Sequence, residues 1–159
     1  MSRYIDIHTH FPTGLHIEPQ GVGIHPWHSA VKQMPSEDEF TQADLIGEIG
    51  LDYVCDVERG QQERVFRAQL AIAERLKKVV VLHCVKAFEP TMKILEEYDL
   101  RTVIFHGFIG SAQQAERATQ KGYFYRSEQV PLVHPKPLRL CAIHRLTKYL
   151  SRATKATKI

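Results

Sequence analysis

The sequence predicts an α/β fold made of successive βα units around a parallel sheet, and two observations lead to this prediction. From Leu45 onward, short apolar runs alternate with longer stretches of helical periodicity, which is the pattern of strands followed by covering helices. The runs at residues 79–82 and 102–105 are almost continuously apolar, as expected of strands that are buried on both faces of a parallel sheet.

The first part of the chain predicts short elements. A β-prone run covers residues 4–10, and a loop rich in turn-forming residues follows it. A second short strand is expected at residues 22–24, because Pro26 lacks the N–H that a longer strand would need. A helix is expected to begin near Ser36, where acidic residues occupy the first turn.

The remainder of the chain predicts longer elements. Strands are expected at residues 43–53, 79–82, 102–105 and from 123, and helices at residues 58–78, 90–98 and 110–120. The clearest helix carries Phe66, Leu70, Ala73 and Leu76 at intervals of three and four residues. This spacing places them on one helix face, which we interpret as the face that packs on the core.

Metal-ligating residue types follow four of the expected strands. His8 and His10 are two residues apart on a strand and therefore share a face. The other three are Glu48, His83 and His106. Because the functional rim of a βα fold forms where its strands end, the sequence predicts a metal site there. Taken singly, each residue has another interpretation: a coincidental histidine pair, a salt bridge for Glu48, and histidines near the core.

Composition indicates one domain of ordinary globular character, with 43% hydrophobic and 25% charged residues. The chain lacks an apolar run of the ~18 residues that a membrane span needs, so no membrane association is expected. Three cysteines without CxxC spacing favour a reducing, cytoplasmic location. Residues 1–125 carry 13 basic and 17 acidic residues, whereas residues 126–159 carry 8 basic residues and one acid.

Several sequence motifs together resemble the TatD-like metal-dependent hydrolases of the amidohydrolase superfamily. The matching motifs are IDIHTH, GIHPWH, IGEIGLDY, VVVLHCVKA, VIFHGFIGS and GYFY, which span about residues 4–125. The resemblance implies a distorted TIM-type (β/α) barrel and hydrolysis of phosphoester bonds, in DNases often with 3′→5′ exonuclease activity. The barrel is expected to be incomplete. The interval between His10 and GIHPWH is too short for a full βα unit, and the late strands of the family are lacking.

The resemblance also implies roles for individual residues. His8 and His10 would hold one metal, His83 and His106 a second, and Glu48 would bridge the two as the catalytic carboxylate. Two divalent ions are expected, with Zn, Mn, Ni or Co suiting this ligand set better than Mg. Substrate-binding roles are expected for Lys86, Ser111, His25 and Asp52. The alternatives are a solvated lysine for Lys86, a helix N-cap for Ser111 and a ligand-orienting role for Asp52.

The resemblance stops at about Tyr125. The family has a later strand ending in Glu-Thr-Asp, whose Asp completes the first metal site, but this chain has no Asp after Asp99. We therefore expect a family portion at residues 1–125 and a basic tail at residues 126–159, produced by truncation or a frameshift. The alternative is a divergent tail with a helix at about residues 138–150.

The sequence is consistent with three alternative functions. The first is a phosphoesterase or DNase that acts on DNA or another phosphoester. The second is a catalytically impaired metal-binding remnant, and the third is a nucleic-acid-binding module that uses the basic tail. A monomer is expected, with self-association through an exposed strand edge as the alternative.

Overall fold

The structure, a computed structural model, describes residues 19–127 and 130–133. The strand expected at residues 4–10, with His8 and His10, lies outside the described residues. So does the alternative helix at about residues 138–150.

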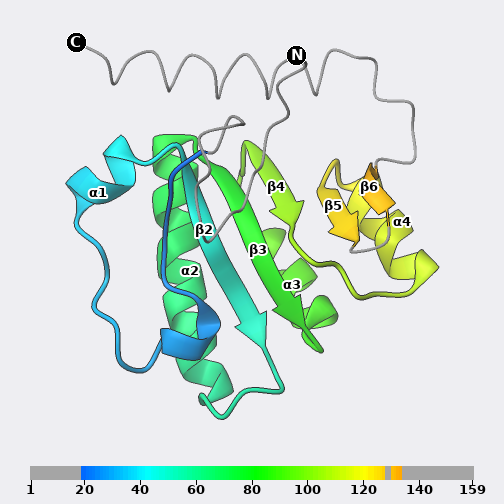
Figure 1. Ribbon diagram of the computed structural model, residues 1–159, viewed down its shortest axis with the longest axis horizontal. Helices are drawn as coiled ribbons and strands as arrows, with labels where there is room; N and C mark the ends of the chain where they lie inside the picture. Colours follow the sequence, from blue (N-terminus) through cyan, green and yellow to red (C-terminus); the bar gives the residue numbers. More distant parts are fainter. Residues whose placement is uncertain (1–18, 128–129, 134–159) are drawn as a thin grey trace.

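The described strands form one six-stranded sheet in which each strand neighbours the next along the chain (Figure 1). The strands are β1 (Gly21–Val22), β2 (Leu45–Asp52), β3 (Val79–Val85), β4 (Thr102–Phe105), β5 (Phe124–Ser127) and β6 (Val130–Val133). The first five are parallel, and β6 pairs antiparallel with β5. Parallel strands in chain order are the arrangement of a (β/α) barrel, whereas the strand order of a doubly wound sheet reverses. The predicted (β/α)-barrel type of fold, with parallel strands, is thus confirmed for the residues that the structure describes.

The helices are α1 (Glu37–Gln42), α2 (Arg59–Leu76), α3 (Phe88–Leu95) and α4 (Ala112–Gln120), with a short 3-10 helix, η1 (Pro26–His28), after β1. In Figure 1, α2 and α3 lie on one face of β2 and β3. Helices α1 and α4 each begin with a capping box, formed by Ser36 with Glu39 and by Ser111 with Gln114. None of the described helices is both long and apolar enough to cross a membrane.

Helix α2 packs on the sheet through the predicted apolar face. Phe66, Leu70 and Ala73 are fully or almost fully buried, and Leu76 packs against the core from its edge. They contact the core that includes Ile46 and Leu82 from β2 and β3. Full burial of one such large side chain stabilises the fold by about 1.5–3 kcal/mol. This interface fixes the two strands that carry the candidate site.

The structure shifts two predicted boundaries. Strand β3 continues to Val85, so His83 lies within the strand and not beyond its end. The helix expected at residues 90–98 begins at Phe88 and ends at Leu95, with Pro90 in its first turn. Proline is tolerated there because the first N–H groups of a helix have no intrahelical partner.

Strand β6 was not expected from the sequence. Its backbone pairs with β5, with Tyr125 opposite Val133 and Ser127 opposite Val130. In the described sheet, the edge of β5 that faces away from β4 is therefore covered by a segment of the basic tail.

Candidate metal centre

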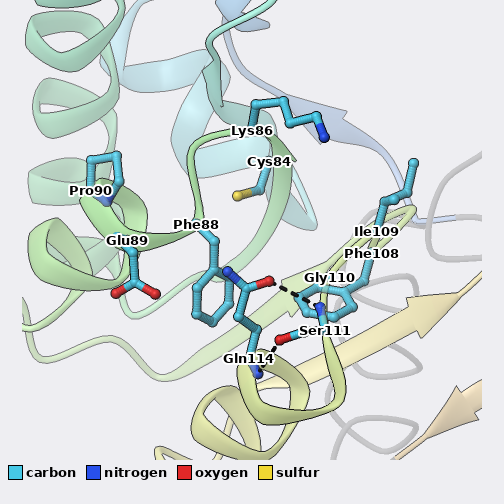
Figure 2. A pocket seen from close by; sticks show the side chains of 10 residues that line it. All are labelled: Cys84, Lys86, Phe88, Glu89, Pro90, Phe108, Ile109, Gly110, Ser111 and Gln114. Atoms are coloured by element: carbon cyan, nitrogen blue, oxygen red, sulfur yellow. Dashed lines mark hydrogen bonds between the residues drawn. The ribbon is translucent and has the colours of Figure 1, made fainter.

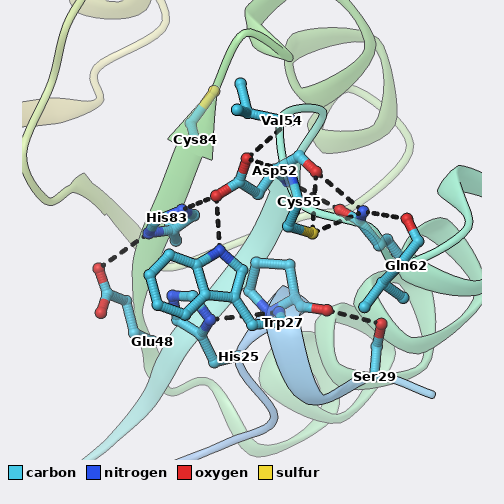
Figure 3. Close-up of polar contacts among 12 residues, drawn as sticks. His25, Trp27, Ser29, Glu48, Asp52, Val54, Cys55, Gln62, His83 and Cys84 are labelled. Carbon is cyan, nitrogen blue, oxygen red and sulfur yellow. Dashed lines mark hydrogen bonds and ion pairs between the residues drawn. The ribbon is translucent and has the colours of Figure 1, made fainter.

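The candidate site is organised by the pairing of β2 with β3. Gly50 of β2 lies opposite His83 of β3, and Asp52 lies opposite Val85. Because side chains alternate along a strand, Glu48, Gly50 and Asp52 share one face of β2. Gly50 has no side chain, so the His83 imidazole is flanked by the carboxylates of Glu48 and Asp52. Figure 3 shows these three side chains in a row.

A β-bulge in β2 positions Glu48. The register advances by three residues from Ile46 to Ile49 on β2, but by only two from Val80 to Leu82 on β3. The extra residue falls in the Gly47–Glu48 segment, and bulges of this kind redirect side chains beside functional sites. The bulge accounts for a carboxylate that turns toward His83 although Ile46 and Ile49, which flank the Gly47–Glu48 segment, are fully buried.

The two nitrogens of His83 each face a carboxylate. Nδ1 lies 3.5 Å from Oε1 of Glu48, and Nε2 lies 2.9 Å from Oδ2 of Asp52. Two ligands that are each ~2.0–2.1 Å from a tetrahedral metal ion lie about 3.4 Å apart. The separation of Glu48 Oε1 and His83 Nδ1 therefore fits two ligands of one cation, and the donor set of imidazole and carboxylate suits zinc-like ions.

His25 joins this pair from a different element. It caps η1, and its Nδ1 accepts a hydrogen bond from the backbone N–H of Trp27 at 3.3 Å. Its ring centroid lies 4.3 Å from that of His83. One ligand atom each from His25, Glu48 and His83 lie within 4.8 Å of one another, the spacing of a potential metal site. Gln69 anchors the preceding residue, because its Oε1 accepts from Ile24 N at 2.6 Å.

The surroundings shift the pKa values of the two histidines in opposite directions. Burial lowers the pKa of His25 to about 4, and the positive field of the neighbouring His83 contributes to this shift. Burial also opposes protonation of His83, but its hydrogen bonds with Glu48 and Asp52 outweigh burial and raise its pKa. Protonated His83 thus carries a positive charge at the place where a metal ion would bind.

These side chains line a cavity of ≈ 600 Å³ that opens at the ends of the strands. His106 lies on the same wall, directly after β4, and its backbone N–H donates to Leu82 O at 2.9 Å. The further polar residues of this wall are Lys32 and His28. The structure therefore brings together Glu48, His83 and His106 from the predicted ligand set. It adds His25, which sequence reasoning assigned to substrate.

Figure 2 shows the residues that line a second cavity of ≈ 480 Å³. This cavity adjoins the first and shares Cys84 and Ile109 with it. Lys86 and Ser111, both expected to contact substrate, line this second cavity. Ser111 Oγ accepts from Gln114 N at 3.2 Å and Gln114 Oε1 accepts from Ser111 N at 3.0 Å, so Ser111 has the N-cap role left open by the sequence.

Asp52, also expected to contact substrate, has a different environment. It is 3% exposed, and its carboxylate contacts His83 and the indole N–H of Trp27. This agrees with the alternative in which Asp52 orients a ligand.

The sequence analysis did not single out the buried glutamines of α2. Gln62 and Gln69 lie seven residues apart on the same helix face as Phe66. Two polar residues on an otherwise apolar helix face are the signal that could have identified them.

Comparison with known proteins identifies the family. The sequence model of the family described as TatD related DNase matches residues 17–139. The matched segment thus begins after His8 and His10 and extends beyond Tyr125.

Individual relatives agree. The uncharacterized metal-dependent hydrolase YjjV of Escherichia coli K12 is 37% identical over 112 residues, which cover 64% of this chain and 43% of YjjV. The 3′-5′ ssDNA/RNA exonuclease TatD of Salmonella typhimurium is 34% identical over 111 residues, which cover 64% and 43%. Human deoxyribonuclease TATDN3 is 29% identical over 127 residues, which cover 65% and 45%.

Solved structures show the same relationship. The crystal structure of the Escherichia coli TatD homologue YjjV superposes with a TM-score of 0.60 at 31% identity, covering 66% of this chain and 44% of YjjV. A TatD family hydrolase from Entamoeba histolytica superposes with a TM-score of 0.56 at 20% identity, covering 66% and 40%, and supports the fold alone. The chain spans less than half the length of these relatives. From the match over residues 17–139 and the shared fold, the chain belongs to the TatD-related DNase family.

Proposed function

We propose that this chain carries the metal centre of a metal-dependent hydrolase that cleaves phosphoester bonds in nucleic acid. The observation that carries the proposal is the 3.5 Å separation of Glu48 Oε1 and His83 Nδ1 on the wall of a cavity. Two Lewis bases at this separation can both ligate a single divalent ion placed between them. Relatives named as a metal-dependent hydrolase, an exonuclease and a deoxyribonuclease support the metal ion and the substrate class.

The proposed ligand set extends beyond this pair. Glu48 would bridge two divalent ions, with His83 and His106 on one side and His8 and His10 on the other. His25 would add a ligand beside Glu48 and His83, for which its place in the three-residue group is the support. Imidazole-rich ligation favours Zn, Mn, Ni or Co over Mg. Bound divalent ions would activate water and polarise the phosphoryl group.

The two adjoining cavities suggest how the substrate would lie. The scissile phosphate would occupy the ≈ 600 Å³ cavity beside Glu48 and His83, and the chain of the substrate would continue into the ≈ 480 Å³ cavity. Lys86 is exposed at the second cavity and carries a cation suited to a neighbouring phosphate. Ser111 Oγ already caps α4, so the contribution of this residue would be to the cavity wall.

The test measures metal content and hydrolysis together. Purified protein would be assayed by elemental analysis and by cleavage of a 3′-labelled single-stranded oligonucleotide, before and after chelation. We expect bound divalent metal, activity that chelation removes, and loss of both in His83→Ala. His28→Ala is the control for metal content, because His28 is an exposed histidine of the same cavity that lies outside the His25, Glu48 and His83 group.

The outcomes separate the alternatives. Hydrolysis that survives chelation or His83→Ala contradicts the proposal. Bound metal without turnover supports the catalytically impaired remnant. DNA binding that persists after chelation and weakens with salt supports a role for the basic tail. The cytoplasmic location and the monomeric state stay predictions from the sequence.

A further inference from the structure

Three elements meet at one oxygen atom beside the candidate metal centre. The indole Nε1 of Trp27, from η1, donates to Oδ2 of Asp52 at 2.6 Å, and Asp52 ends β2. The same oxygen lies 2.9 Å from Nε2 of His83 on β3. Figure 3 shows both bonds converging on this carboxylate, on the side of His83 opposite to Glu48.

The carboxylate of Asp52 is held firmly. Its Oδ1 accepts from the backbone N–H groups of Val54 at 2.9 Å and of Cys55 at 3.3 Å. The Asp52 backbone is fixed by buried Gln62, whose Oε1 accepts from Asp52 N at 2.7 Å and whose Nε2 donates to Asp52 O at 2.8 Å. Both oxygens and both backbone groups of Asp52 are therefore engaged, which is the arrangement expected of a group that orients another.

The contacts also determine where the proton of neutral His83 lies. The indole N–H of Trp27 and the backbone N–H groups of Val54 and Cys55 all donate to the carboxylate of Asp52, which is the environment of an ionised carboxylate. An ionised carboxylate only accepts hydrogen bonds. Nε2 of His83 must therefore donate to Asp52, which leaves the lone pair of Nδ1 directed at the Glu48 side.

Trp27 is partly exposed but has a buried hydrogen-bond partner. The residue is 55% exposed, among the most exposed large apolar residues of the described chain. Its indole N–H makes a short bond to the carboxylate of Asp52, whose side chain is 5% exposed. The indole also lies edge-on to His25 and His83, with centroid distances of 4.9 Å and 6.0 Å.

We propose that Trp27 and Asp52 form a positioning pair, which holds His83 as the Nε2–H tautomer and presents its Nδ1 to a cation beside Glu48. The inference rests on the proposed metal centre for its consequence, but the tautomer is a property of the metal-free protein. Metal-ligating histidines commonly donate their second N–H to a carboxylate. The indole donor from η1 adds a third member to that arrangement.

The test reads the tautomer directly. Long-range ¹H–¹⁵N NMR of the histidine rings would be recorded on metal-free protein, at a pH where His83 is neutral. We expect the proton of wild-type His83 on Nε2. Asp52→Ala removes the acceptor and should produce a tautomer mixture, with divalent metal affinity lower by roughly 10–100-fold. Trp27→Phe keeps an aromatic ring but removes the N–H, and should show a smaller shift in the same direction.

Tyr53→Phe is the matched control. It removes a hydrogen bond of 2.8 Å to Glu63 at the same end of β2, without a contact to His83, and should leave tautomer and affinity unchanged. A proton on Nδ1 in wild type overturns the inference, as does a Trp27→Phe variant with unchanged tautomer and affinity. If the protein binds no metal or hydrolyses nothing, the hydrolase proposal fails, while the tautomer readout still decides the positioning pair.

Discussion

Gly50 and His83 face each other across β2 and β3 so closely that a Cβ atom at position 50 would lie 2.0 Å from the carbonyl oxygen of His83. Gly50 also has a φ of +138°, which side-chain-bearing residues rarely adopt. Because Gly50 has no side chain, β2 can lie this close to β3. The close approach places Glu48 and Asp52 of β2 beside His83 of β3.

We expect Gly50→Ala to lower the free energy of unfolding by more than about 2 kcal/mol, because β2 and β3 must separate to make room for the added methyl group. This loss lies toward the upper end of the cost of one strained backbone residue. It should also weaken metal binding, since Glu48 and His83 lie on the separated strands. Gly122→Ala is the control, because Gly122 has a φ of +79° with open space around it and tests the backbone cost alone. Urea denaturation measures both variants, and equal losses would contradict the close-contact argument.

His25→Ala tests whether the third histidine is a ligand. Its place with Glu48 and His83 predicts a loss of metal affinity of roughly tenfold or more, as expected when one imidazole leaves a coordination shell. Competition with a chelating dye measures this affinity. His106→Ala, measured alongside, tests the ligand implied by the family resemblance. An unchanged affinity in His25→Ala would mean that His25 only lines the cavity.

Metal binding should release a proton at low pH. The pKa of His83 is raised above its ordinary value of 6.5, so at about pH 6 its imidazole is charged in the metal-free protein. The pKa of His25 is about 4, so His25 is already neutral there. A metal ion must therefore displace about one proton, and its affinity should fall as the pH falls through the pKa of His83.

Calorimetric titration in buffers with different ionisation enthalpies measures the proton count. We expect proton release to be largest near pH 6 and to fall as the pH rises through the pKa of His83, because the imidazole is then neutral before the metal binds. A release that stays the same across this interval would show that His83 does not exchange a proton for the metal.

Gln69→Leu tests how the segment before His25 is held. Gln69 is fully buried, and its amide accepts from Ile24 N at 2.6 Å and donates to Ile24 O at 3.2 Å. Leucine leaves both backbone groups without this partner, which should cost about 1–3 kcal/mol in the free energy of unfolding. Gln113→Leu, on the exposed surface of α4, should cost far less in the same thermal or urea measurement. Similar costs would argue against the anchoring role.

Much of the sheet follows from the sequence, because apolar runs and helical periodicity are local signals. The strand at Thr102–Phe105 and the apolar face of α2 are examples that the structure confirms. Strand β6 was not predictable, because its pairing with β5 depends on a neighbour and not on its own pattern. The extension of β3 past His83 likewise depends on pairing with β2.

The sequence was sufficient to predict which strand ends carry the residues of the site. Glu48 and His83 were expected to meet, and they lie side by side. The place of His25 beside them was not predictable, since it depends on how η1 packs against β3. The bond from Trp27 to Asp52 joins residues 25 positions apart, and only the register of separate elements brings them together.

The most direct test is anomalous diffraction from crystals soaked with Zn²⁺ or Mn²⁺. We predict a peak between Oε1 of Glu48 and Nδ1 of His83, at roughly 2.0–2.2 Å from each atom. Crystals that show no peak there at saturating metal, or that show metal bound away from both residues, would contradict the proposed metal centre.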